Sequence, residues 1–378
     1  MKITGIICEY NPFHLGHRKQ ITAIKDENPD SGVVCLMSGN YVQRGMPAIF
    51  DKQYRAKAAI LCGANLVLEL PVTATLSSAE GFASEGVRIL GGFCDELSFG
   101  AENADLDILL KTAHALLSPD FSMHLKEALS AGLSFPSARQ KALEVMGLDA
   151  TILRKPNNIL AVEYCKAIVS QKSQMKPMPI YRGGDYHDVN ADAENPSASS
   201  LRLLMEQGKL WEDFVPREAC TCFENAPIHT LHNGEQAILY RLRTMQDEEF
   251  QALPYGSEGL WRKLMKNARK YASLEEILTA TKSKRYTRTR LDRMVLCAYL
   301  GFTDTHIATS APYTRVLALN DKGRDILVKA RETGCFPNLG EKMDHPYQQI
   351  ENRCDDLYGF FAKQSTKSQK QRIYYHKG

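Results

Sequence analysis

Short apolar runs alternate with amphipathic stretches through the first hundred residues of the chain. The apolar runs are rich in valine, isoleucine, leucine and cysteine, as strands buried on both faces are, and they cover Ile3–Cys8, Gly32–Met37, Leu66–Leu70 and Glu96–Phe99. Between them, polar residues recur at the helical period in His17–Glu27, Asp51–Cys62 and Ser77–Leu90. This alternation predicts an α/β core with a parallel sheet and right-handed crossovers. Ligands of such sheets bind beyond the carboxyl ends of the strands.

Helical patterns dominate the rest of the chain. Residues 101–200 are mostly helical in pattern, broken at three prolines and followed by one predicted strand, Pro179–Arg182, and a loop, Gly183–Asp188. Beyond Trp211 few strand signals interrupt the predicted helices, which cover Gly234–Met245, Gly259–Tyr271, Ser273–Thr281 and Thr289–Leu300. We therefore predict a first domain of residues 1–210 and a mostly α-helical second domain of residues 211–378, with a mobile tail from Lys363 onward.

Charge is distributed unevenly along the chain. The net charge is only +3, but residues 251–378 carry 23 lysines and arginines against 13 aspartates and glutamates, and the first 250 residues are about −7. The asymmetry favours a polyanionic partner for the C-terminal part, and a solvated basic surface is the alternative. The ten cysteines lack a CxxC pair and are expected to be reduced structural thiols. The chain has no signal-peptide pattern and no apolar run of membrane-spanning length, so we expect a cytoplasmic protein.

The most informative motif follows the first predicted strand. The segment Glu9–His17 contains His14-Leu15-Gly16-His17, and a helix is predicted to begin at or near the second histidine. A helix N-terminus presents free N–H groups and partial positive charge to an anion. Two imidazoles there can donate to triphosphate oxygens while pyrophosphate leaves. Neither a Walker lysine loop nor a G-x-G-x-x-G fingerprint occurs in the chain, so a phosphate site must be built differently.

Two further segments are candidates for binding anions. Ser197, Ser199 and Arg202 lie in a serine-rich helix start and are predicted phosphate contacts, with a plain serine N-cap as the alternative. Asn40, Gln43 and Arg44 lie in the loop Ser38–Gly45 and are polar groups suited to bind a small carboxylate or the α-phosphate. Gly39 and Gly45 favour a mobile flap here, and an ordinary polar loop after a strand is the alternative.

Together these motifs resemble the bacterial tRNA(Met) cytidine acetate ligase family, within the superfamily of HIGH-type nucleotidyltransferases. The resemblance covers about the first 300 residues and rests on Ile7–His17, Ser38–Gly45, Phe99–Glu102, Pro156–Ala161, Arg182–Asp188, Ser197–Arg202 and the basic stretch Lys284–Arg293. One departure is Ala101, where the family pattern has a serine. The resemblance implies a Rossmann-like nucleotidyltransferase core with a parallel sheet, followed by a mostly α-helical C-terminal domain.

The resemblance also implies the reaction and its site. Acetate would be activated with ATP as acetyl-AMP, and the acetyl group would pass to N4 of the wobble cytidine (position 34) of elongator tRNA(Met). His14 and His17 would be catalytic. The implied ATP-binding residues are Ile7, Cys8, Glu9, Tyr10, Asn11, Pro12, Phe13, His14, Leu15, Gly16, His17, Arg18, Lys19, Gln20, Gly100, Asn157 and Arg182. For Asn157, a structural role before the following helix is the alternative. Mg²⁺ is expected with ATP, although the sequence offers no recognisable cluster of metal ligands.

The second half-reaction accounts for the basic C-terminal part. Eleven lysines and arginines lie between Trp261 and Arg293, and tRNA binding is assigned to Lys284, Arg285, Arg288 and Arg290. Interleaved aromatic residues can stack unpaired bases or can simply fill the helical core. A nucleotidyltransferase that makes a small-molecule cofactor would explain the histidines but not the basic half, and a non-catalytic RNA-binding protein would not need the histidines. No obligate protein partner is evident from the sequence.

Overall fold

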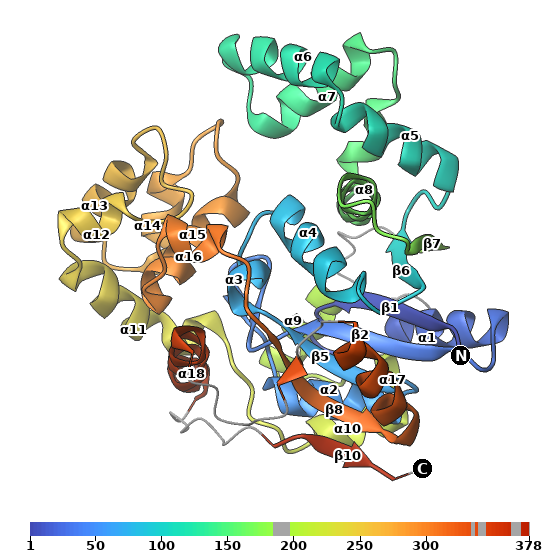
Figure 1. The fold of residues 1–378 in the computed structure, drawn as a ribbon. Helices are drawn as coiled ribbons and strands as arrows, with labels where there is room; N and C mark the ends of the chain where they lie inside the picture. Colours follow the sequence, from blue (N-terminus) through green and yellow to red (C-terminus); the bar gives the residue numbers. More distant parts are fainter. Residues whose placement is uncertain (184–196, 334–336, 339–344, 364–371, 378) are drawn as a thin grey trace.

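The computed structural model describes residues 1–183, 197–333, 337–338, 345–363 and 372–377 (Figure 1). Most of the predicted loop Gly183–Asp188 and most of the tail after Lys363 lie outside these residues. The strands are β1 Ile3–Cys8, β2 Gly32–Ser38, β3 Tyr41–Val42, β4 Met46–Pro47, β5 Leu66–Leu70, β6 Glu96–Ala101, β7 Lys176–Tyr181, β8 Thr314–Asn320, β9 Pro337–Asn338 and β10 Tyr374–His376.

Helices make up most of the remaining described chain. The α-helices of the first half are α1 Leu15–Glu27, α2 Lys52–Leu61, α3 Val72–Thr75, α4 Ala79–Leu90, α5 Leu106–Leu116, α6 Pro119–Ser130, α7 Phe135–Val145, α8 Pro156–Ser170 and α9 Ala198–Glu206. Those of the second half are α10 Arg217–Phe223, α11 Leu231–Thr244, α12 Asp247–Gln251, α13 Leu260–Lys270, α14 Leu274–Thr281, α15 Arg288–Leu300, α16 Asp304–Ala308, α17 Asp321–Glu332 and α18 Pro346–Tyr358. None of the described helices combines the length and the apolar character needed to cross a bilayer.

One mostly parallel sheet organises the molecule. Its strand order is β10-β8-β5-β2-β1-β6-β7, with β9 paired to β8, and only the β5/β8 pair is antiparallel. The chain leaves β1 toward β2 on one side and returns to β6 on the other. This reversal creates a topological switch point at the carboxyl ends of β1 and β6, where α/β proteins bind ligands. The motif with His14 follows β1 directly, so the prediction of a parallel α/β core is confirmed.

Side chains alternate across the sheet because successive residues of a strand point to opposite faces. Val34 of β2 belongs to a hydrophobic cluster that includes residues of α4, α5, α8 and α17, whereas its neighbour Val33 belongs to a cluster that includes residues of α1, α2, α9 and α10. Every residue of β2 and β5 is buried, which explains why these strands are continuous apolar runs in the sequence.

The helices α11 to α15 share a separate hydrophobic cluster with α18. Tyr41 of the β3/β4 hairpin and Leu76 after α3 belong to the same cluster. In Figure 1 this helical region stands to the left of the sheet, and the pair α6/α7 lies at the top, above α8. The two groups of helices therefore flank the region beyond the ends of β1 and β6.

The chain after residue 210 does more than form helices. β8 and β10 join the main sheet, with β8 beside β5, and α17 packs on the sheet. The sequence patterns did not predict these strands. The division into two domains at residue 210 remains a prediction. In the structure, strands that follow residue 210 complete the sheet formed by the strands before it.

A buried cluster of charges attaches α18 to the sheet. Lys52 and Arg315 are surrounded by the carboxylates of Glu69, Glu351 and Asp355. Lys52 Nζ lies 2.7 Å from Asp355 Oδ1, and Arg315 Nε lies 2.8 Å from Glu69 Oε2. Three carboxylates against two cations leave one excess negative charge in a buried site. Burial, opposed by Arg315 and reinforced by Glu69, raises the pKa of Glu351 to about 7.

This raised pKa predicts a pH-dependent stability. Between about pH 5 and 7 the folded state binds a proton at Glu351 that the unfolded state, with a pKa of about 4.3, has lost. The free energy of unfolding should therefore fall across this window as the pH rises, by roughly 2 to 4 kcal/mol. Glu351→Gln mimics the protonated form and should remove the slope. Thermal melting from pH 5 to 8 tests this against the exposed control Glu248→Gln, and parallel profiles for wild type and Glu351→Gln would refute it.

Candidate active site

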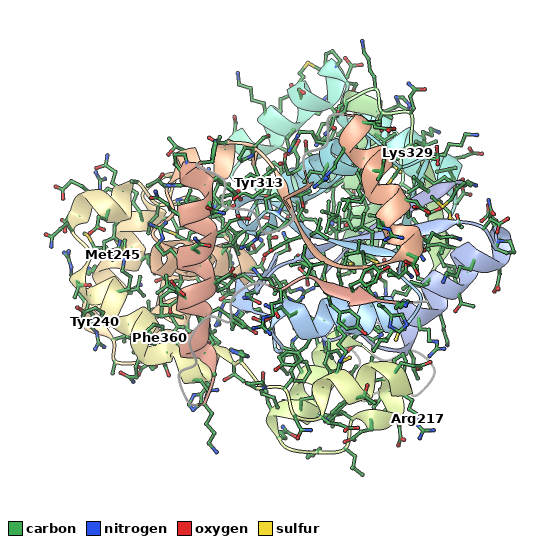
Figure 2. All side chains as sticks on the ribbon, turned by 60° about the horizontal axis from the view of Figure 1, so that its bottom comes forward. Arg217, Tyr240, Met245, Tyr313, Lys329 and Phe360 are labelled. Atoms are coloured by element: carbon green, nitrogen blue, oxygen red, sulfur yellow. The ribbon has the colours of Figure 1, made fainter. Side chains whose placement is uncertain are left out.

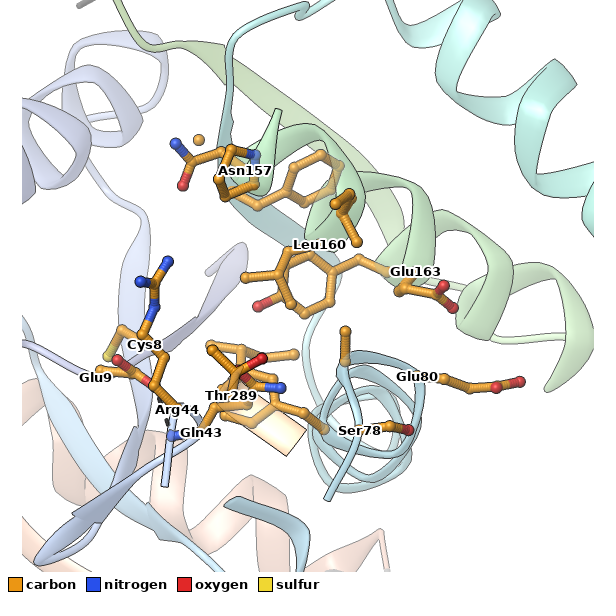
Figure 3. A pocket seen from close by; sticks show the side chains of 18 of the residues that line it. Cys8, Glu9, Gln43, Arg44, Ser78, Glu80, Asn157, Leu160, Glu163 and Thr289 are labelled. Carbon is orange, nitrogen blue, oxygen red and sulfur yellow. Dashed lines mark hydrogen bonds between the residues drawn. The ribbon is translucent and has the colours of Figure 1, made fainter. Parts of the chain in front are cut away.

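A cavity of about 1140 Å³ opens at the switch point of the sheet. Its lining includes the loop after β1, the ends of β6 and β7, the start of α4, one face of α8 and the N-terminal part of α15. Figure 3 shows Asn157 and Leu160 on the α8 side of this pocket, with Gln43, Thr289 and Ser78 on the side across from them. Segments from both halves of the chain therefore meet in one pocket.

His14 and His17 begin α1 as a reciprocal cap. His14 is the N-cap residue, and its Nδ1 accepts the backbone N–H of Gly16 at 3.1 Å. Nδ1 of His17 accepts the backbone N–H of His14 at 3.2 Å, and the two rings stack with centroids 3.7 Å apart. The helix starts two residues earlier than predicted because the first histidine, and not the second, supplies the cap.

This arrangement fixes the tautomer of both rings. Burial lowers the pKa of His14 well below 6.5, and the nearby Arg182 and Arg202 lower it further. Burial also lowers the pKa of His17, with His14 and Arg182 adding to the effect. The rings are therefore neutral at pH 7, and because each Nδ1 accepts a hydrogen bond, each proton sits on Nε2. His14 Nε2 is buried and has no partner within the described residues, so it is a donor in the pocket wall without an acceptor.

The loop that carries the histidines is held rigidly from outside. Arg55, fully buried on α2, donates to the backbone oxygens of Glu9, at 2.6 Å, and of Phe50, Ser38 and Gly39. Asn11 Oδ1 accepts the N–H of Ile49 at 2.7 Å, and Arg202 Nη1 donates to the carbonyl of Asn11 at 2.7 Å. Such bonds orient the imidazoles before any ligand arrives, which is the preorganisation that electrostatic catalysis requires.

Most of the predicted nucleotide-binding residues lie around this pocket. Those that line it are Ile7, Cys8, Glu9, Tyr10, Asn11, His14, Gly16, His17, Lys19, Gln20, Gly100, Asn157 and Arg182. The pocket lining does not include Pro12, Phe13, Leu15 or Arg18. Phe13 packs against Tyr10 and His17, and Arg18 pairs with Glu218 at 2.7 Å.

Asn157 lies in the first turn of α8, where a carboxylate already occupies the helix start. Glu102 accepts the side-chain N–H of Asn157 at 2.8 Å and the backbone N–H of Asn158 at 2.8 Å. Asn158 Oδ1 in turn accepts the N–H of Asn103. The structural role considered for Asn157 is therefore present, although the residue also lines the pocket. Gly100 lies next to Arg182, whose Cδ would be 3.7 Å from an added Cβ.

The serine-rich segment serves the fold. Ser197 caps α9 by accepting the N–H of Ser200, and Ser199 accepts a hydrogen bond from Arg202. Ser197, Ser199 and Arg202 are all outside the pocket lining, and Arg202 acts on it through the Asn11 carbonyl. Their assignment as phosphate contacts stays a prediction that the geometry does not favour.

The loop expected to be a flap is an anchored hairpin. Asn40 Oδ1 accepts the N–H of Lys52 and its Nδ2 donates to Asp355, so Asn40 belongs to the buried charge cluster and not to the pocket. Gln43 and Arg44 do line the pocket, and Gln43 N–H donates to Glu9 Oε1 at 2.8 Å. Gly45 has a φ of 80°, and a Cβ there would lie 2.3 Å from the backbone nitrogen of Arg293. This close approach seats the hairpin against α15.

The basic residues assigned to tRNA divide into two groups. Arg285 and Arg290 line the pocket, whereas Lys284 and Arg288 do not. Arg285 pairs with Glu258 at 2.7 Å, and Arg288 pairs with Glu275 at 2.6 Å and with Asp292 at 2.9 Å. Arg290 donates to the carbonyl of Tyr255 and to Ser257. Three of the four cations therefore already have acceptors within the helical region.

Sequence patterns missed a large part of the lining. Apolar residues of α6 and α7, among them Phe121, Leu125 and Phe135, form one side, and Tyr255 forms part of another. No local pattern could have found them, because each looks like an ordinary core or surface position of its own helix.

Comparison with known proteins connects this pocket to a family. A model of the HIGH Nucleotidyl Transferase family matches residues 1–372. The tRNA(Met) cytidine acetate ligase of Clostridium perfringens is 35% identical, and that of Anoxybacillus flavithermus is 33% identical; each alignment covers 95% of this chain and 95% or 94% of the relative. This chain belongs to the tRNA(Met) cytidine acetate ligase family of HIGH nucleotidyl transferases.

Solved structures agree with the family assignment. Apo Thermotoga maritima TmcAL matches over the full length of both chains with a TM-score of 0.92 and 27% identity. The same protein bound with alpha-thio ATP matches with a TM-score of 0.89, again over both full chains. The predicted family is thus confirmed, and with it the class of fold.

Proposed function

We propose that this protein is an ATP-dependent ligase that activates acetate as acetyl-AMP and transfers the acetyl group to N4 of the wobble cytidine (position 34) of elongator tRNA(Met). The observation that carries the proposal is the single pocket shared by the histidine loop and the arginines of α15. The names of the relatives supply the substrates, and the complex of the Thermotoga maritima protein with an ATP analogue supports ATP binding.

The histidine loop is suited to the first half-reaction. Acetate oxygen attacks the α-phosphorus, the bond to the bridging oxygen breaks, and pyrophosphate leaves with the electron pair. Nε2–H of His14 and His17 and the free N–H groups at the start of α1 can donate to the oxygens on which negative charge accumulates. This needs no nucleophile from the protein, because positioning and charge stabilisation supply the catalysis.

The second half-reaction requires room for a nucleobase beside the acetyl-adenylate. The cytidine amine attacks the acetyl carbonyl, AMP leaves, and the amine loses a proton. A cavity of about 1140 Å³ exceeds the roughly 300 to 1,000 Å³ of ordinary small-molecule pockets, and Arg290 and Arg293 of the basic helix α15 line it. A single-stranded anticodon loop can present its base there without melting a helix.

Mg²⁺ is proposed to arrive with ATP. Within the described residues, no three His, Cys, Asp or Glu side chains come together as a metal site. Of the carboxylates in the pocket, Glu80 and Glu163 are both paired with Lys166, and Glu9 holds the Gln43 N–H. The ion would therefore be bound mainly by phosphate oxygens and water. A tRNA substrate places the proposed activity in the cytoplasm.

The deciding experiment follows labelled acetate. The protein is incubated with ATP, labelled acetate and bulk tRNA, and label is measured in acetyl-AMP and in RNA. Transfer to RNA is the expected result. Acetyl-AMP without RNA labelling would contradict the proposed acceptor, and pyrophosphate release that depends on another small molecule would favour a cofactor-making nucleotidyltransferase.

We propose that Arg182 binds ATP. It follows β7 directly, lines the pocket and lies close enough to both histidines to lower their pKa values. Arg182→Lys should weaken ATP binding by about tenfold, because a point charge cannot reproduce the planar fork of a guanidinium. Calorimetric titration with ATP measures the effect, and an unchanged Kd would exclude the role.

A further inference from the structure

Arg293 on α15 is a buried cation with no carboxylate in ion-pair contact within the part of the chain that the structure describes, and Asp292 is a carboxylate near enough to feel its charge. The residue is 9% exposed, and it lines the large pocket. No carboxylate within the described residues forms an ion pair with it: the adjacent Asp292 is bonded to Arg288, and Glu258 is bonded to Arg285. Its contacts are the carbonyl of Gln43, 3.4 Å from Nη1, and the ring of Tyr255, whose centroid lies 5.1 Å from Cζ.

A buried guanidinium is unfavourable unless an anion or hydrogen-bond acceptors compensate its charge. Arg293 Nε is fully buried and has no acceptor among the described residues. Burial lowers the pKa of Arg293, which shows that its surroundings penalise the charge. A buried, unpaired charge normally destabilises a protein. Its position in the wall of a substrate pocket indicates an anionic ligand group that compensates the buried charge.

The position on α15 indicates which anion this is. Arg285, Thr287, Thr289, Arg290 and Arg293 all line the pocket, so this wall is formed by one short stretch of chain. Figure 3 places Thr289 across the pocket from Asn157 of α8. The histidines and Arg182 are the residues proposed for ATP, and they come from the loop after β1 and from the end of β7. The wall formed by α15 is therefore available to the second substrate.

Resting on the proposed function, we infer that Arg293 binds a backbone phosphate of the RNA nucleotide that enters the pocket. A guanidinium with one bond to a protein carbonyl retains donors for a phosphate oxygen. The backbone of Gln43 connects this contact to the ATP site. Its N–H donates to Glu9, and its carbonyl accepts from Arg293. Arg293 is therefore a substrate-positioning residue that holds the cytidine against the acetyl-adenylate.

The test compares Arg293→Met and Arg293→Lys with the control Arg243→Met. Arg243 lies on α11 outside the pocket and also donates to backbone carbonyls. Two activities are measured for each variant: acetate-dependent exchange of pyrophosphate into ATP without RNA, and acetylation of tRNA over a salt series. A second arm uses wild-type protein with anticodon stem-loops that carry a neutral methylphosphonate on either side of the target cytidine.

The expected result is a split between the two activities. Arg293→Met should lower kcat/KM for RNA by about tenfold to a hundredfold, much more than it lowers the exchange activity, with a slope of log K against log salt that flattens by about 0.7. Arg293→Lys should be intermediate. One neutral linkage should impair wild type to a similar extent and should add nothing to Arg293→Met.

Two outcomes would overturn the inference. A raised KM for acetate in the exchange reaction would assign Arg293 to the acetate carboxylate. Unchanged RNA kinetics, with or without a lower melting temperature, would assign it to packing. Because the arm with methylphosphonate RNA uses wild-type protein, it remains informative if Arg293→Met folds poorly. If the wild-type protein does not acetylate RNA, the proposed function itself is contradicted. This outcome is distinguishable because it is measured on the wild-type protein and not on a variant.

Discussion

His14→Asn should lower acetyl-AMP formation by about 100-fold to 1,000-fold while leaving the fold intact. An asparagine at the N-cap can still accept the Gly16 N–H, so the cap on α1 is retained. What is lost is the Nε2–H donor in the pocket wall, and removal of one transition-state donor typically costs about 2.7 to 4 kcal/mol. Acetate-dependent pyrophosphate exchange and thermal melting, measured together, test this.

His17→Gln is the matching change at the third helical position. Glutamine there can accept the backbone N–H of the cap residue, as in an ordinary capping box. We expect the same loss of exchange activity with little change in melting temperature. His14→Ala, by contrast, should lose both activity and about 1 kcal/mol of stability with the cap. If His14→Asn and His17→Gln exchange pyrophosphate near the wild-type rate, the histidines serve only to start the helix.

The parts of the molecule that could be predicted are those whose cause is local in sequence. β1, β2, β5 and β6 are continuous apolar runs because both faces of the sheet are covered. The histidine site was found for the same reason. His14 and His17 are three residues apart, so the strand end, the cap and the two rings are all determined within Ile3–His17.

β8 illustrates what a sequence alone cannot reveal. Arg315 lies near the start of this buried strand, where an arginine argues against burial. Its charge is tolerated because Glu69, Glu351 and Asp355 surround it, and Glu69 is 246 residues away in the chain. The position of Arg293 also depends on a contact between distant segments, since Gly45 lets the hairpin approach α15 closely. Contacts between distant segments, and not propensities, place these residues.

The structure also changes which cations are expected to bind RNA outside the pocket. Arg285 and Arg288 are engaged with Glu258, Glu275 and Asp292. Reversing their charge would place carboxylates side by side and could disrupt the helical region. Exposed cations of this region for which the described residues provide no carboxylate include Arg262, Lys263, Lys266 and Lys270 on α13 and Lys282 and Lys284 after α14. The guanidinium of Arg262 lies over the ring of Trp261, with Cζ 4.9 Å from the centroid, and the ammonium of Lys270 lies over the ring of Tyr271, with Nζ 5.0 Å from the centroid. Both residues are exposed.

The triple change Arg262→Glu, Lys266→Glu and Lys270→Glu should therefore raise the Kd for tRNA by roughly tenfold or more at moderate salt, because each lost phosphate contact also removes a released counterion. Acetate-dependent pyrophosphate exchange should be unaffected, since α13 does not line the pocket. The control is Lys329→Glu with Arg331→Glu on α17, which lies on the sheet away from the helical region (Figure 2). It reverses two charges against three, so losses are compared per reversed charge.

Filter binding over a salt series decides between the explanations. If α13 contacts the RNA backbone, the slope of log K against log salt should flatten by about 0.7 to 0.9 for each contact removed. The α17 control should change neither the slope nor the Kd. Equal losses for α13 and α17 would mean that only net charge matters. A fall in exchange activity together with RNA binding would indicate damage to the fold, and an unchanged Kd would place the RNA on another surface of the protein.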